Sequence, residues 1–213
     1  MKAIFQMLMV LVFANLVSQA DAQDLGVNKG KELYQKKCRF CHQEGANGKP
    51  GVGTSLSNKE FLSIVSADWL KKVIETGVPG TNMPPQKKLG DENIRAIVSY
   101  VQSLSPLSGT RAKEVVSQPP SKGNAKSGKV LFASVCSTCH GETGTGYDAG
   151  GSGPAIGTQG FLNMVSDGFI RTTIKEGRSN TMMRGFSGPS GLANLSDRET
   201  EDIIAYLRTV PTK

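Results

Sequence analysis

Histidine is scarce in this chain, whose 213 residues include only two, alongside four cysteines and one tryptophan. Two imidazoles are too few for most zinc hydrolases and for any chemistry that needs several imidazoles. Large apolar side chains are also sparse, since aromatic residues make up 6% and hydrophobic residues 38% of the chain. In globular domains, apolar residues usually make up roughly 45–50% of the chain when glycine is counted among them. The 25 glycines narrow that gap but cannot fill a core.

Long apolar runs are missing except at the N-terminus. There Met1 and Lys2 precede a mostly apolar run over residues 4–17, and Ala-Asp-Ala follows at residues 20–22. This order predicts a signal peptide over residues 1–22 and a mature, exported chain that begins at Gln23. The run is too short and too interrupted for a good membrane span, so we expect a soluble periplasmic protein. Retention as an uncleaved anchor is the alternative.

The mature chain consists of two copies of one unit. Residues 30–42 match residues 128–140 at an offset of 98, and later matches, such as Gly77 with Gly177, follow at an offset of 100. A repeat of this kind indicates two structural units of the same fold.

Between the two copies, residues 107–124 are rich in Ser, Pro, Lys and Gly. This composition predicts an exposed linker of extended character. The expected domains are therefore residues 23–106 and residues 125–213. A single apolar core is marginal in domains of this size, which often need a covalent or metal staple.

Each copy has the sequence pattern of helices rather than strands. Apolar spacing predicts helices that begin near Ala67 and Asp167, each ending at a C-terminal glycine. Residues 90–101 predict another helix with acidic residues in its first turn, and Ser196 to Glu199 form a capping-box pattern that opens its counterpart. The glycine-rich stretch 144–157 follows no strand, so it is a poor candidate for phosphate binding. The sequence predicts an all-α fold.

All four cysteines and both histidines fall in two copies of one motif, Cys-x-x-Cys-His. The copies lie at Cys38, Cys41 and His42 and at Cys136, Cys139 and His140. This motif attaches c-type haem. Two thiols about one helical turn apart can each bond to one edge of a porphyrin, and the adjacent imidazole can turn beneath the ring to ligate iron. The motifs therefore predict two covalently attached haems c.

A zinc site and redox-active disulfides are the alternatives. Structural zinc sites usually place their Cys pairs about 15–20 residues apart, whereas a whole domain separates Cys41 from Cys136. Redox-active Cys-x-x-Cys pairs lie near a βαβ pattern, and the sequence shows none. Both alternatives fit less well than haem.

Methionine is the predicted sixth ligand of each iron, because the motifs already use both histidines. Met83 lies 41 residues after His42, and Met183 lies 43 residues after His140. Both lie in loops just past a predicted helix, where a thioether can reach iron. Alignment of the repeats favours Met183 over its neighbour Met182, which stays an alternative.

The mature chain resembles two fused class I c-type cytochrome domains over nearly all of residues 28–106 and 125–211. The resemblance implies two tandem all-α domains, each wrapped around one covalent haem. In this family an N-terminal helix with a glycine and an aromatic residue crosses a C-terminal helix with an aromatic residue. The sets that match are Gly30, Tyr34 and Tyr100 in one copy and Gly128, Phe132 and Tyr206 in the other.

The family also places a proline after the haem motif, and its carbonyl orients the ligating histidine. Pro154 fits this role for His140, whereas the counterpart segment has Thr54 and no proline. The resemblance therefore implies the hydrogen bond for His140 and leaves that of His42 open. Because such bonds tune ligand basicity and potential, this difference favours unequal potentials at the two haems.

His/Met ligation fills both axial positions and raises the iron potential relative to His/His. No position remains for oxygen or peroxide, so we expect electron transfer rather than catalysis, and a dihaem enzyme would need one labile Met ligand. A freely diffusing periplasmic carrier is preferred to an electron-transfer subunit of a larger oxidoreductase complex. The oligomeric state is not predicted.

Positive charge is concentrated in the first domain. Residues 23–106 carry 12 Lys and Arg against 8 Asp and Glu, whereas residues 125–213 carry 9 against 8. The basic residues beside the first haem motif and its ligand loop predict docking of an acidic redox partner near that haem.

An exported haem protein without interleaved basic and aromatic residues is a poor binder of nucleic acid. Trp69 and Phe169 are expected as core residues that pack near a haem, and Met164 as core packing.

Overall fold

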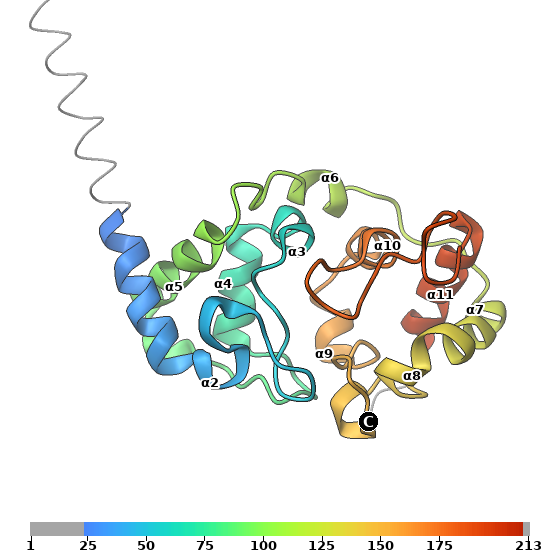
Figure 1. Cartoon of the computed structure of the whole chain (residues 1–213), viewed down its shortest axis with the longest axis horizontal. Coiled ribbons are helices and arrows are strands. Elements are labelled where there is room, and N and C mark those ends of the chain that lie inside the picture. Colours follow the sequence, from blue (N-terminus) through green and yellow to red (C-terminus); the bar gives the residue numbers. More distant parts are fainter. Residues whose placement is uncertain (1–23, 211–213) are drawn as a thin grey trace, which may run out of the picture.

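A computed structural model describes residues 24–210, and it shows two helical domains side by side, bridged along one edge by a short helix (Figure 1). The predicted signal peptide lies outside the described residues. The first domain begins with a helix over residues 24–37. Its other helices are α2 (Arg39–His42), η1 (Glu44–Ala46), α3 (Lys59–Ile64), α4 (Ala67–Thr76), η2 (Lys87–Leu89) and α5 (Asp91–Ser103).

The second domain repeats this order of elements, except that it has no counterpart of η2. Its helices are α7 (Ala125–Leu131), η3 (Phe132–Cys136), α8 (Ser137–His140), η4 (Gly146–Ala149), α9 (Gln159–Leu162), α10 (Asp167–Glu176) and α11 (Asp197–Thr209). Among the described residues, β structure is limited to isolated bridges. The prediction of an all-α fold with two tandem domains is confirmed.

The helix ends lie where the sequence predicts them. Gly77 and Gly177 terminate α4 and α10 with φ angles of 64° and 72°, a conformation that costs glycine little because it has no Cβ. The capping box at the start of α11 is formed, since the Ser196 hydroxyl accepts from the Glu199 N–H and the Glu199 carboxylate accepts from the Ser196 N–H.

Each domain is closed by the predicted crossing of its first and last helices. A Cβ on Gly30 would lie 1.9 Å from the Ala96 carbonyl oxygen of α5, and a Cβ on Gly128 would lie 1.8 Å from the Asp202 carbonyl oxygen of α11. Only glycine permits this approach. The aromatic partners flank the crossings as expected, with ring centroids 5.2 Å apart for Tyr34–Tyr100 and 5.3 Å apart for Phe132–Tyr206.

The segment between the domains is not the extended, exposed linker that its composition predicts. It contains α6 (Ala112–Val116), whose Ala112 and Val115 side chains are buried. Its backbone is tied to α3, because the N–H groups of Gly109 and Arg111 donate to the Leu62 and Ser63 carbonyls, both at 2.8 Å. The expectation is wrong because a few apolar residues among Ser, Pro and Lys fold as a helix that packs against both α3 and α10.

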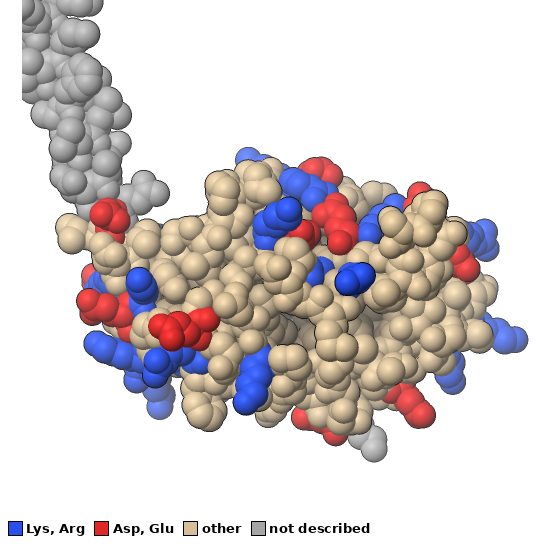
Figure 2. Space-filling view, viewed as in Figure 1, with Lys and Arg blue, Asp and Glu red and all other residues tan. Residues whose placement is uncertain are grey.

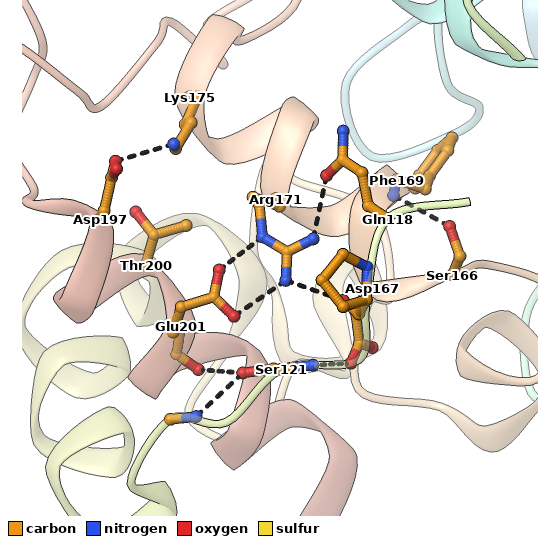
Figure 3. Close-up of polar contacts among 12 residues, drawn as sticks. Gln118, Ser121, Ser166, Asp167, Phe169, Arg171, Lys175, Asp197, Thr200 and Glu201 are labelled. Atoms are coloured by element: carbon orange, nitrogen blue, oxygen red, sulfur yellow. Dashed lines mark hydrogen bonds and ion pairs between the residues drawn. The ribbon is translucent and has the colours of Figure 1, made fainter. Parts of the chain in front are cut away.

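The end of this segment is fixed to the second domain through Arg171 of α10 (Figure 3). The Arg171 guanidinium donates to the Gln118 side chain at 2.9 Å and forms a two-point ion pair with Glu201 of α11. Nearby, the Ser121 N–H donates to the Asp167 carboxylate at 2.7 Å and the Ser121 hydroxyl donates to the Glu201 carbonyl at 2.8 Å. A half-buried, two-point arginine pair of this kind restrains orientation as well as distance.

An aromatic cluster lies between the two domains. Trp69 of α4 stacks on Phe169 of α10, with ring centroids 5.9 Å apart and planes inclined by 24°. Phe61 and Phe161 flank this pair edge-on, at 5.9 Å from Trp69 and 6.3 Å from Phe169. The Trp69 indole N–H donates to the Met164 carbonyl across the boundary at 2.6 Å. Trp69 and Phe169 are thus packed against each other between the domains, and not only within the separate cores that the sequence suggests.

The helix crossing gives a matched pair of substitutions within one helix. Gly30→Ala should destabilise the protein by about 1–3 kcal/mol or more, because its Cβ must displace backbone of α5. Gly26→Ala has no atom within 4 Å of the new Cβ and should stabilise by about 0.5–1 kcal/mol, the usual gain for replacing a helical glycine. Chemical unfolding of both variants measures the difference, and equal effects would contradict the close crossing.

Two candidate haem sites

The two cysteine motifs are built on equivalent short helices. Cys38 lies at the N-terminal cap of α2 and Cys136 at that of α8, while His42 and His140 are the last residues of these helices. The next residues, Gln43 and Gly141, have φ angles of 63° and 76°, so the chain turns sharply away beneath each histidine. Gln43 is held in this unusual conformation by the Tyr34 hydroxyl, which donates to its carbonyl at 2.8 Å.

Both histidines are buried and oriented by a backbone carbonyl. The His140 Nδ1 lies 2.8 Å from the Pro154 carbonyl oxygen, which confirms the expected hydrogen bond. The His42 Nδ1 lies equally close, 2.8 Å, to the Thr54 carbonyl oxygen. With Nδ1 as the donor in each bond, Nε2 keeps its lone pair for a metal.

The bond to Thr54 settles what the sequence left open for His42. Because the acceptor is a main-chain carbonyl, threonine supplies it as well as proline does. Alignment of residues 53–56 with 153–156 could have located it. The missing proline therefore gives no reason to expect different potentials at the two haems.

Burial also sets the protonation of the two imidazoles. It lowers the pKa of both His42 and His140, while the backbone hydrogen bonds to Thr54 and Pro154 oppose the shift in part. The rings are therefore neutral near pH 7, which is the form of histidine that ligates a metal.

A glycine after each motif allows the following loop to approach the motif more closely than any residue with a Cβ could. A Cβ on Gly153 would lie 2.8 Å from the His140 ring, and a Cβ on Gly53 would lie 2.5 Å from the Cys41 carbonyl oxygen. The loop after each motif can therefore lie directly against the histidine helix. The opposite side of the imidazole, which carries Nε2, is thereby left for a haem iron.

The four thiols are free and half-buried. Burial, helped by the neighbouring cysteine, raises the pKa of Cys38 to about 11 and that of Cys136 to about 12. Redox-active Cys-x-x-Cys pairs instead need a lowered thiol pKa. Within residues 24–210, no three His, Cys, Asp or Glu side chains come together as a metal site, so the two motifs do not combine into a zinc centre. The donor set of each motif fits covalent haem best.

The two predicted ligand methionines lie on loops with the same internal hydrogen bonds. In the first domain the Val78 N–H donates to the Met83 carbonyl at 3.0 Å, and the Thr81 hydroxyl accepts from the Met83 N–H at 3.2 Å. In the second domain the Arg178 N–H donates to the Met183 carbonyl at 2.6 Å, and the Thr181 hydroxyl accepts from the Met183 N–H at 3.1 Å.

Exposure distinguishes the two adjacent methionines of the second loop. The Met183 side chain is half-buried and packs against the core, whereas Met182 is 70% exposed. Met164 is half-buried at the domain boundary, where its carbonyl accepts from the Trp69 indole, and its expected packing in the core stays a prediction. The assignment of Met83 and Met183 as iron ligands stays a prediction.

Comparison with known proteins agrees with the geometry of both sites. Residues 26–101 match the family model for subunit III of cbb3-type cytochrome c oxidase, and residues 125–211 match the cytochrome c model. The chain carries two tandem cytochrome c domains. Two such domains imply two covalently attached haems c, one at each cysteine motif.

Relatives of this dihaem cytochrome c include cbb3-type cytochrome c oxidase subunits named CcoP. The protein from Rubrivivax gelatinosus is 30% identical over 93% of this chain and 60% of its own length. A protein from Rhodobacter capsulatus is 26% identical over 86% of this chain and 62% of its own length. The chain thus spans about 60% of the length of these relatives.

A solved structure, the reducing HAO-like protein complex of Kuenenia stuttgartiensis, matches with a TM-score of 0.48 and 22% identity, over 85% of this chain and 95% of that chain. Within residues 24–210 of the cytochrome, no helix combines the length and the apolar composition needed to cross a membrane.

Proposed function

We propose that this dihaem cytochrome transfers single electrons between redox partners through two six-coordinate irons. His42 and Met83 would ligate the iron of the first domain, and His140 and Met183 would ligate that of the second. The observation that carries this proposal is the pair of imidazoles whose Nδ1 is bound to a carbonyl at 2.8 Å, so that each Nε2 is free for iron.

The side chains of each domain have separate roles. Cys38 and Cys41, like Cys136 and Cys139, hold the porphyrin by thioether bonds, and haem c supplies a one-electron couple when bound. The carbonyls of Thr54 and Pro154 fix the ring orientation of the histidines and raise their basicity. A methionine thioether as the sixth ligand favours reduced iron.

The choice of Met183 over Met182 follows from where the two side chains lie. Met183 packs inward from a loop closed by its own backbone hydrogen bonds, while Met182 projects into solvent. The inward side chain of Met183 is therefore the better candidate of the two for an iron ligand.

Carbon monoxide tests electron transfer against catalysis. The reduced protein at neutral pH should bind no carbon monoxide at either haem, because a histidine and a methionine would together leave no position open on the iron. Met83→Ala and Met183→Ala should each open one iron and give one equivalent of binding, measured by optical titration. Stoichiometric binding to the unmodified protein would instead support a dihaem enzyme with a labile methionine.

The first domain has exposed basic residues in two segments: Lys36, Lys37 and Arg39 lie beside Phe40 at its haem motif, and Lys87 and Lys88 follow its ligand loop. Phe40 itself is 88% exposed. Lys and Arg gather along the lower edge of the first domain in Figure 2. The aligned positions of the second domain hold no charge, being Ser134, Val135, Ser137, Thr138, Ser187 and Gly188.

This asymmetry favours the first domain as the docking site for an acidic redox protein. Lysines and an arginine around one exposed aromatic side chain provide steering charges and an apolar contact in the same place. A close approach there brings the partner to the helix that carries Cys38, Cys41 and His42. The second domain then exchanges electrons with a partner of a different surface character.

Ionic strength and matched charge variants test the docking surface. Electron transfer with an acidic blue-copper protein should fall about tenfold at low salt when Lys36 and Lys37 are both changed to Gln, within the usual range of electrostatic steering. The control changes Lys126 and Lys129 of the second domain to Gln and should leave the rate unchanged. Stopped-flow rates that do not depend on salt in the unmodified protein would contradict the docking site.

A second candidate role, as a subunit of a larger oxidase complex, is favoured by the relatives that are named as cbb3-type oxidase subunits. We prefer a free periplasmic carrier, because the N-terminal sequence fits a signal peptide better than a membrane span.

Fractionation of host cells separates the free carrier from the subunit. The free carrier should be found in the periplasmic fraction with Gln23 as its N-terminal residue. Recovery in the membrane fraction, together with oxidase activity, would instead establish the subunit role.

A further inference from the structure

The two domains meet through pairs of contacts that the sequence repeat relates to each other. Ser179, just past α10, lies against Glu60 of α3, and Pro79, just past α4, lies against Gly160 of α9. Residues 60 and 160 are repeat equivalents, as are 79 and 179. The arrangement therefore has the reciprocal pattern of an isologous dimer interface. It also means that each ligand loop begins in contact with the other domain.

The two loop contacts differ in chemistry. Glu60 accepts two hydrogen bonds from Ser179, one from the N–H at 3.0 Å and one from the hydroxyl at 2.6 Å. Pro79 occupies the equivalent position in the first domain, and it has neither an N–H nor a hydroxyl to donate such bonds. The contact of Pro79 with Gly160 is instead a close backbone approach, in which an added Cβ would lie 2.0 Å from the Pro79 carbonyl oxygen.

Arg178 strengthens the contact of the second loop. Its guanidinium lies over the Phe61 ring of the first domain at 5.0 Å and over the Phe169 ring of the second at 5.2 Å. One guanidinium nitrogen donates to the Thr173 hydroxyl at 2.9 Å. A cation placed over two aromatic faces from different domains holds those faces in one arrangement.

The contact is connected directly to Met183. The Arg178 N–H donates to the Met183 carbonyl, the Thr181 N–H donates to the Arg178 carbonyl at 3.2 Å, and Gly177 pairs with Arg184 in an isolated bridge. Residues 178–183 thus form one hydrogen-bonded loop, with Glu60 bound at its first turn. Moving Met183 away from its position must disturb this loop.

We propose that Glu60 of the first domain is a positioning residue for Met183 of the second domain. By accepting both bonds from Ser179, it holds the ligand loop closed, and the sixth ligand of the second haem therefore depends on contact with the first domain. The first ligand loop has no equivalent pair of bonds, because Pro79 replaces the donor. This inference rests on the proposed function of Met183 as an iron ligand.

Competition with imidazole measures how firmly Met183 is held. Met83→His in the full-length holoprotein fills the sixth position of the first haem with an imidazole, so the far-red band of methionine-ligated ferric haem reports on Met183 alone. In this background Glu60→Ala should raise the imidazole affinity of the second haem about tenfold, since two hydrogen bonds to a charged acceptor no longer oppose loop opening.

Matched variants separate positioning from general stability. Glu60→Gln keeps an acceptor and should have a smaller effect than Glu60→Ala. Ser179→Ala removes one of the two bonds without changing α3 and should also raise the affinity. Asp68→Ala removes an exposed carboxylate from α4 of the same domain and should leave the affinity unchanged.

Two results would overturn the proposal in different ways. If Met183→Ala leaves the far-red band in the Met83→His background, Met183 is not the ligand and the proposed function fails with it. If Met183→Ala abolishes the band while both Glu60→Ala and Ser179→Ala leave the imidazole affinity unchanged, the ligand assignment stands and the positioning role of Glu60 is wrong.

Discussion

The hydrogen bond from each histidine Nδ1 to a backbone carbonyl is the interaction on which both sites depend. It fixes the tautomer, the ring orientation and the free Nε2 of His42 and His140. Each bond is possible because a glycine lets the following loop lie against the motif. The rest of each domain, above all the crossing at Gly30 or Gly128, holds the helix that carries the two thiols and the ring. The residues that would bind the haem and the contacts that hold them in place thus both involve one short helix per domain, α2 or α8.

Much of this arrangement is predictable from the sequence, because its signals are local. The cysteine motifs, the glycine ends of α4 and α10, the capping box at Ser196 and the glycine–aromatic crossings all depend on residues with one favoured role at fixed spacing. The hydrogen bond to Thr54 is harder to predict because a main-chain acceptor leaves no residue-type signal. The helix at residues 112–116 is missed because its stability comes from packing against α3 and α10, which composition does not reveal.

The relation between the two domains is the least predictable part of the structure. The stack of Trp69 on Phe169, the position of Arg178 over the Phe61 ring and the bonds from Ser179 to Glu60 join residues about 100 positions or more apart. Repeat alignment pairs Trp69 with Phe169 but cannot show that they touch. These contacts hold the two similar domains together, and they give the two ligand loops different surroundings.

The central claim, two haems c that each exchange one electron, is tested most directly by a haem count combined with a potentiometric titration. The pyridine haemochrome of the purified chain should give two covalent haems per polypeptide. The titration should take up two electrons per chain, both at the high potentials typical of His/Met ligation. A single haem per chain, or a couple at low potential in either domain, would contradict the account.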